Sequence, residues 1–220
     1  MNKKILALLL AFAMMFSTIT VAFADETATI GADAAALETM GVIQGETGEV
    51  TPEYLAKETT RIQAAIMYLR LRGLEDEALA FTGTANFPDA NTMVWGGGKA
   101  VMAYLKANPQ LGWIGADGGK FNPFEKVTVQ QYYKVMLEAL GYKQTTDEAE
   151  GDFTWSEVLA FAAEKGLTKV AEVTGFTNND LAIATMEALK LNVKGETKTL
   201  AVKLVDAGMI NKEAAIEAGL

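Results

Sequence analysis

The sequence predicts an all-α protein assembled from three related units, each containing one capped helix. Three times a Thr stands three residues before a Gln or Asp, just ahead of an apolar stretch with helical spacing. In a capping box the Thr hydroxyl accepts the backbone N–H three residues on, and the longer side chain reaches back to the Thr N–H. One copy is common, but three copies predict an internal repeat. The copies are Thr60-Arg61-Ile62-Gln63, Thr128-Val129-Gln130-Gln131 and, with a shorter Asp, Thr177-Asn178-Asn179-Asp180.

The first unit is expected over residues 25–81. A helix over 34–40 ends at Gly41, a suitable residue for the left-handed position after a helix. The loop Gly41-Val42-Ile43-Gln44-Gly45 and a polar turn follow, and then the capped helix. In that helix one face is apolar and predicts the side that enters the core. The face consists of Ile62, Ala65, Ile66 and Leu69.

The second unit, 82–144, has the same order of parts: Phe87-Pro88-Asp89, Trp95 ahead of a helix, the 112–115 loop, a glycine turn, Phe121-Asn122-Pro123, and a capped helix ending at Gly141. The third unit, 145–193, is degenerate. It keeps Trp155 at the head of a helix but lacks the glycine turn and the proline. The remaining segment, 194–220, predicts one or two short amphipathic helices, interpreted as packing helices rather than a fragment of a fourth repeat.

Residues 1–24 are typical of a signal peptide. Lys3 and Lys4 precede an apolar run, and Ala22-Phe23-Ala24 is a cleavage site of the Ala-x-Ala type. We therefore expect cleavage and export rather than an uncleaved membrane anchor. No later segment has the roughly 18 apolar residues that a membrane span requires, so the mature chain is expected to have no transmembrane segment.

Composition removes several classes of function. Without Lys3 and Lys4 the chain has 17 basic and 28 acidic residues, a formal charge of −11, which argues against binding nucleic acid. There is no His and no Cys, so a Ser-His or Cys-His nucleophile pair and the usual zinc sites cannot be built. Asp117-Gly118-Gly119 offers too few oxygens for calcium. We expect no metal, no cofactor and no enzymatic activity, although a hydrolase with two carboxylates remains open.

The ordered set of motifs resembles the S-layer homology (SLH) module. The parts that carry the resemblance are Phe87-Pro88-Asp89 with Trp95, Gly41-Val42-Ile43-Gln44-Gly45, Phe121-Asn122-Pro123 and Thr60-Arg61-Ile62-Gln63. No single motif is specific, but the tandem order behind a signal peptide is. The resemblance covers residues 30–192.

This resemblance implies a pseudo-threefold bundle of three repeats with grooves between neighbouring repeats. It also implies a protein held on the outside of a Gram-positive-type envelope, in its wall or S-layer, by binding a secondary cell-wall polysaccharide that often carries pyruvate ketals. A guanidinium matches such a carboxylate in bidentate fashion. The arginine of the motif is Arg61 in the first unit, but Val129 and Asn178 stand in its place in the other two.

Five residues are therefore candidates for ligand binding. Arg61 is the principal anion contact, with a solvated charge or a salt bridge to a carboxylate such as Glu58 as the alternative, and Arg61→Ala is expected to leave folding intact. Asp89 is either an acceptor for sugar hydroxyls or a helix cap. Trp95 and Trp113 are either exposed to a sugar or packed, with packing favoured for Trp95. Gly45 completes the set, with backbone geometry as its alternative role.

The sequence thus predicts a secreted, non-catalytic envelope protein that binds secondary cell-wall polysaccharide. The alternative is a structural or protein-interaction component of the cell surface that has lost the glycan site and packs against other envelope proteins.

Overall fold

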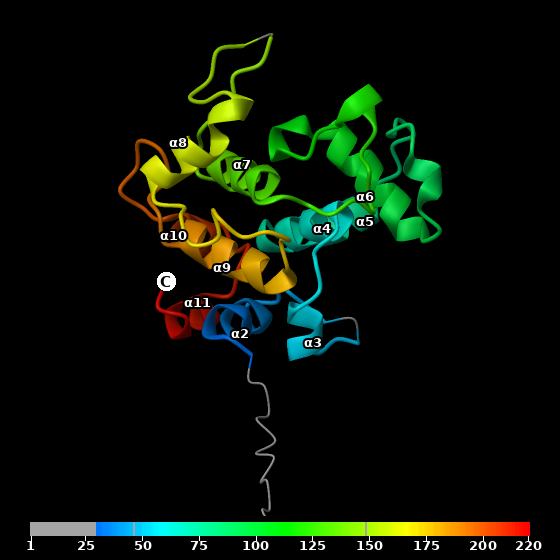
Figure 1. Ribbon diagram of the computed structural model, residues 1–220. Coiled ribbons are helices and arrows are strands. Elements are labelled where there is room, and N and C mark those ends of the chain that lie inside the picture. Colours follow the sequence, from blue (N-terminus) through cyan, green and yellow to red (C-terminus); the bar gives the residue numbers. More distant parts are fainter. Residues whose placement is uncertain (1–29, 46, 148) are drawn as a thin grey trace, which may run out of the picture.

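The structure, a computed structural model, describes residues 30–45, 47–147 and 149–220. Within these ranges the regular secondary structure consists of helices, with no strand (Figure 1). The prediction of an all-α fold is confirmed. The predicted signal peptide, residues 1–24, lies outside the described residues. Four isolated β-bridges occur between loops, and two of them join the capped helices.

The helices are joined by connections of very different length, and several of the long ones contain a 3-10 turn. The α-helices are α2 (Ala32–Thr39), α3 (Pro52–Leu55), α4 (Arg61–Leu71), α5 (Glu75–Leu79), α6 (Gly96–Ala107), α7 (Val129–Ala139), α8 (Val158–Lys165), α9 (Asn178–Leu189), α10 (Leu200–Asp206) and α11 (Lys212–Glu217). The 3-10 turns are η1 (Ala90–Thr92), η2 (Pro109–Leu111), η3 (Asp117–Gly119) and η4 (Trp155–Glu157).

Helices α4, α7 and α9 begin where the capping motifs predict. Thr60, Thr128 and Thr177 are their N-caps, and each forms both halves of a capping box. Because the first backbone N–H groups of a helix have no partner within it, these reciprocal bonds fix where the helix starts. The short Asp180 suffices in the third copy, where its Oδ2 accepts the Thr177 N–H at 2.9 Å.

The segments that precede the three caps meet one another. The Thr59 N–H donates to Phe176 O at 2.9 Å, and the Val127 N–H donates to Thr59 O at 3.0 Å. Antiparallel bridges join Glu58 to Thr177 and Thr60 to Lys126. The segment before α4 therefore lies between the other two and bonds to both, which brings the N-termini of α4, α7 and α9 together at one junction.

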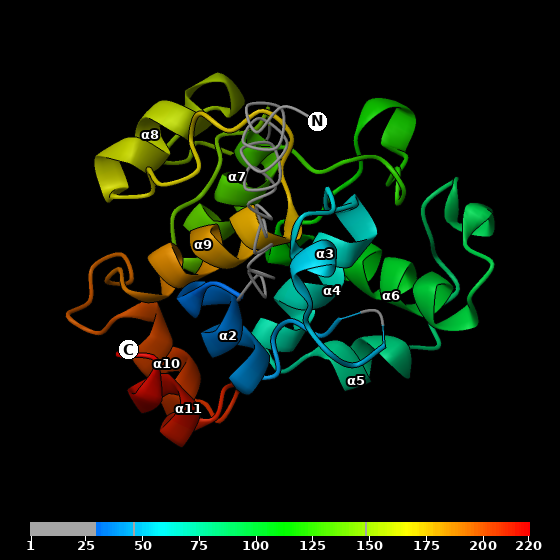
Figure 2. The ribbon, with the colours of Figure 1, turned by 60° about the horizontal axis from the view of Figure 1, so that its bottom comes forward.

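The first helix of each unit packs on a helix of another unit: the second unit on the first, the third on the second, and the first on the third. Helix α6 contacts α5, α8 contacts α7, and α2 contacts α9, so the first and third units touch although they are far apart in sequence (Figures 1 and 2). These contacts fit the expected arrangement of three repeats, which itself stays a prediction.

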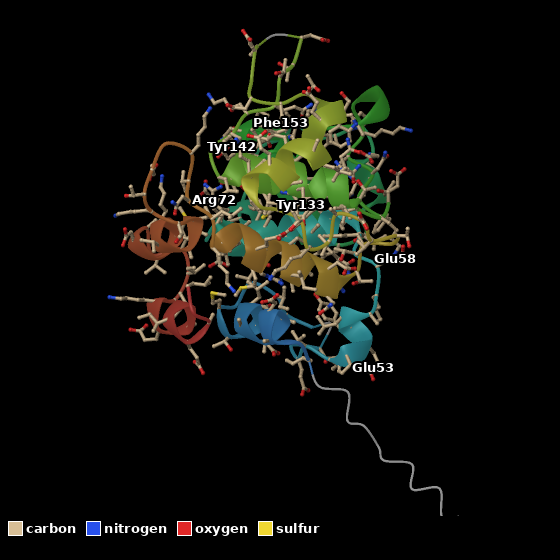
Figure 3. All side chains as sticks on the ribbon, turned by 60° about the vertical axis from the view of Figure 1, so that its left-hand side comes forward. Glu53, Glu58, Arg72, Tyr133, Tyr142 and Phe153 are labelled. Carbon is tan, nitrogen blue, oxygen red and sulfur yellow. The ribbon has the colours of Figure 1, made fainter. Side chains whose placement is uncertain are left out.

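Large apolar side chains fill the space between these helices, and two buried tyrosines form hydrogen bonds there. Tyr132 Oη lies 2.6 Å from Thr185 Oγ1, joining α7 to α9. Tyr133, labelled in Figure 3, donates to Glu187 Oε2 at 2.9 Å. Burial raises the pKa of both tyrosines. The largest buried side chains are Trp113, Tyr68, Tyr132, Tyr133, Phe121, Leu37, Ile43 and Leu69.

Segment 194–220 forms two short helices that complete this core. Helix α10 contacts α9, and α11 contacts both α10 and α2, next to the C-terminus (Figure 2). Leu200, Leu204 and Ile210 are buried there, as expected for packing helices. Within the described ranges, no helix combines the length and apolar character needed to cross a membrane.

Candidate functional site

A groove of about 400 Å³ opens beside the N-terminus of α4. Its walls come from three parts of the chain: the first turn of α4, the loop 112–116 with the adjoining face of α7, and the turn η4. It is lined by Arg61, Gly112, Trp113, Ile114, Gly115, Ala116, Gln131, Lys134, Val135, Gln144 and Trp155. The groove thus brings together residues that lie almost a hundred positions apart.

Arg61 lies in the wall of the groove and is only 6% exposed. Its Nε donates to Phe121 O at 2.8 Å and its Nη2 to Ile114 O at 3.2 Å, while the guanidinium carbon stands 5.1 Å from the Phe121 ring centroid. Burial lowers the pKa of Arg61, whereas Glu125 and Asp89 act to raise it. An arginine stays charged even so. The partners are carbonyl oxygens, so Arg61 is neither a solvated charge nor in a salt bridge to Glu58.

A second cation, Lys134 on α7, lies in the same groove. Its Nζ donates to Gly112 O at 2.9 Å. The same Nζ is 2.9 Å from Glu138 Oε2, an ion pair whose geometry is not that of a hydrogen bond. Burial raises the pKa of Glu138, and Lys134 opposes that effect. Lys134 is therefore ion-paired with a carboxylate, whereas Arg61 hydrogen-bonds carbonyl oxygens and is affected by the Glu125 and Asp89 carboxylates without an ion pair to either among the described residues.

The rim of the groove is apolar and accessible. Trp155 is 45% exposed, and its backbone carbonyl accepts a 2.7 Å bond from Gln130 Nε2, which ties the turn η4 to α7. Ile114, also 45% exposed, belongs to the opposite wall. An aromatic face and an aliphatic side chain above two cations suit a ring that carries a negative group.

Trp113 lines the groove but does not offer an exposed face. It is 2% exposed and stands edge-on to Tyr68, with ring centroids 6.3 Å apart. Its Nε1 is buried and finds no hydrogen-bond acceptor among the described residues. Of the two roles considered for Trp113, packing is the one its surroundings fit.

Asp89 holds a loop next to the groove rather than lining it. Its two carboxylate oxygens accept the backbone N–H groups of Phe121 and Asn122 at 2.9 and 2.7 Å. These bonds secure Asn122 in a left-handed conformation with φ of 56°. Arg61 binds the carbonyl of the same Phe121, so Asp89 fixes the backbone that Arg61 contacts.

Trp95 and Gly45 lie elsewhere. Trp95 is 49% exposed and precedes α6, so it is not a core residue. A Cβ on Gly97 would lie 2.4 Å from the Trp95 ring, so the Trp95 indole packs against the backbone of the glycine run. A Cβ on Gly45 would overlap Glu49 O, which makes the loop fold the reason for glycine there.

Of the residues that line the groove, sequence reasoning proposed only Arg61 and Trp113 for binding; those it missed include Ile114, Lys134, Gln144 and Trp155. The repeat itself carried a signal for Trp155, which occupies the same place in its unit as Trp95. Nothing in the sequence distinguishes Lys134 from an ordinary solvated lysine of an amphipathic helix. No group of three or more acidic residues in the described ranges is arranged to hold a metal ion.

Comparison with known proteins yields one weak similarity. The chain is 28% identical over 148 residues to a "Cell surface protein" of Thermoanaerobacter kivui. The aligned part is 64% of this chain but 19% of that protein, so the chain spans about a fifth of this relative's length. No family model matches the chain, and no solved structure matches it. The similarity fits a role at the cell surface.

Proposed function

We propose that this protein is a secreted, non-catalytic envelope protein that binds secondary cell-wall polysaccharide in the groove beside α4. The observation that carries the proposal is the pairing of two buried cations, Arg61 and Lys134, with an exposed aromatic face, Trp155, in one groove. The lining of the groove includes two cations and no carboxylate. Cations attract an anionic substituent such as a pyruvate ketal, and an indole covers a sugar ring.

Arg61 supports this role although it is buried. The structure shows no acceptor for its Nη1 among the described residues, because its bonds run from Nε and Nη2. The two carbonyls hold the guanidinium in one orientation, which lowers the entropic cost of binding an anion. The net charge of −11 opposes an anionic polymer only over roughly 8 Å at physiological salt, so a local pair of cations can outweigh it.

The test is cosedimentation of the chain from residue 25 onward with wall sacculi, either intact or stripped of secondary polysaccharide. Binding should require the polysaccharide and should weaken by about tenfold in Trp155→Ala, a loss equivalent to about 1.4 kcal/mol. Trp95→Ala is the matched control, because Trp95 is equally exposed but lies outside the groove. Loss of binding in Trp95→Ala alone would place the site at α6 instead, and no binding to either preparation would refute the proposal.

A second candidate is a structural role through protein contacts. Leu79, Val94 and Trp95 are 37%, 100% and 49% exposed at the N-terminal end of α6, and apolar side chains grouped on a surface are typical of interaction sites. Sedimentation velocity at increasing concentration tests this role, with Val94→Asp as the variant. Self-association that Val94→Asp abolishes, without any binding to polysaccharide, would favour it.

A further inference from the structure

We propose that the binding site extends beyond the groove at Arg61 into a second groove, so that the protein recognises a segment of at least two sugar residues. The first groove takes the anionic residue and the second takes a neutral neighbour. This inference rests on the proposed function and specifies its ligand: an internal or terminal stretch of polymer rather than a single charged sugar.

The second groove, of about 280 Å³, lies at the C-terminal end of α7. It is lined by Pro109, Gln110, Glu138, Gly141, Tyr142, Lys143 and Gln144. It is smaller than the first groove, whose volume is about 400 Å³. Its charged groups are one carboxylate and one ammonium, so it has no surplus of cations.

The two grooves adjoin one another. Gln144 lines both, and the Lys134–Glu138 pair places its lysine in the first groove and its glutamate in the second. Between them Gly112 has a φ of 83°, and a Cβ there would meet Glu138 Oε2 at 2.2 Å. Glycine at this position leaves room for the Glu138 carboxylate, and a ligand that spans the two grooves would pass Gln144, which lines both.

The chemistry of the second groove suits a neutral sugar. The side chains of Gln110, Gln144 and Glu138 supply amide donors and oxygen acceptors for hydroxyl groups. Tyr142 supplies a ring that its neighbours hold in place: it stands edge-on to Phe161 at 5.3 Å, and Lys165 Nζ and Lys194 Nζ lie 5.4 and 5.8 Å from its centroid. Phe153 stacks on the same Phe161, with ring centroids 5.2 Å apart; Tyr142 and Phe153 are labelled in Figure 3. A ring that is already ordered loses little entropy on binding.

The experiment measures affinity as a function of ligand length. Secondary cell-wall polysaccharide is partially hydrolysed, separated by size, and titrated calorimetrically into the chain from residue 25 onward. Fragments long enough to fill both grooves should bind about tenfold more tightly than the shortest binding fragment. Gln110→Trp, at an exposed residue of the second groove, should remove that gain and leave the affinity for the shortest fragment unchanged.

The matched control is Gln44→Trp, which puts the same indole at an exposed glutamine that lines neither groove. It should leave the length dependence intact. Equal affinity for all fragments, or a length dependence that Gln110→Trp does not alter, would overturn the second groove while the proposed function stands. Failure of every fragment to bind would overturn both.

Discussion

The N-termini of α4 and α9 solve the same structural problem with different side chains. In each helix the residue after the cap reaches across to a backbone carbonyl of another unit. Arg61 donates to Phe121 O, and Asn178 Nδ2 donates to Tyr54 O at 2.9 Å. The carbonyls occupy comparable places, each a few residues before the next unit's capped helix. Asn178 also accepts the Thr59 hydroxyl at 2.7 Å and is 1% exposed.

The two side chains differ in the hydrogen-bonding groups that remain available to a ligand. Asn178 uses both ends of its amide within the protein, so nothing remains for a ligand. Arg61 is longer and has five N–H donors, and it both joins the units and lines a groove. Val129 at the start of α7 can make neither bond and is simply buried. The two residues that stand in place of the motif arginine therefore differ: Asn178 joins two units by hydrogen bonds within the protein, and Val129 makes only apolar contacts.

The largest expected effect is at Asn178, whose side chain joins α9 to the first unit through hydrogen bonds to Tyr54 and Thr59. Asn178→Ala removes two buried hydrogen bonds and leaves the Thr59 hydroxyl without its acceptor in a site with no exposure. We expect the free energy of unfolding to fall by about 3 kcal/mol, measured by urea denaturation. Asn179→Ala, one residue on in the same turn, is the control and should change stability by less than about 0.5 kcal/mol. Equal effects of the two variants would show that the tether is unimportant.

Arg61 should contribute to stability as well as to binding, because it forms two hydrogen bonds to backbone carbonyls. This prediction differs from the expectation, drawn from the sequence, that Arg61→Ala leaves folding intact. Arg61→Met keeps the aliphatic stem but removes both donors to Phe121 O and Ile114 O. Relief from burying a charge offsets part of the loss, so we expect a cost of about 2 kcal/mol in urea denaturation.

The control for this variant is Arg70→Met on the same helix, which breaks a half-buried pair with Glu75 and should cost about 0.5 kcal/mol. An Arg61→Met variant as stable as the parent would separate Arg61 from Asn178 and make it a ligand residue alone.

The sequence predicted the helices far better than the site. Capping boxes and glycine stops act within four or five residues, so Thr60, Thr128 and Thr177 could be identified from local pattern. Helices α2 and α7 likewise end just before Gly41 and Gly141, as expected. The expected order of units 25–81, 82–144 and 145–193 rests on the same signals.

The site depends instead on contacts of long range. The carbonyls that Arg61 binds belong to Ile114 and Phe121, which lie 53 and 60 positions away in the sequence. No local sequence pattern predicts these contacts. Asn178 was noted in the sequence only as a missing arginine, although its polar side chain at the same place was the signal for a tether. Trp95 and Trp155 share a place in their units, yet which of them lines a groove is decided by the tertiary arrangement.

The smallest expected effect is in α7, where Val129 makes no hydrogen bond from its side chain to another unit and the N-cap is Thr128. Thr128→Ala removes a cap whose Oγ1 accepts the Gln131 N–H at 3.2 Å, and nothing else at this exposed residue changes. We expect a loss of about 1 kcal/mol in thermal or urea unfolding. Thr177→Ala should cost more, because the Thr177 side chain is half-buried at the junction of the caps and its hydroxyl also donates to Asp180 Oδ2 at 2.6 Å. Thr39→Ala, at the exposed end of α2 rather than at a cap, controls for loss of a threonine. If Thr128→Ala and Thr177→Ala cost the same, the junction contributes nothing beyond the caps, and the contrast between tethered and untethered helices fails.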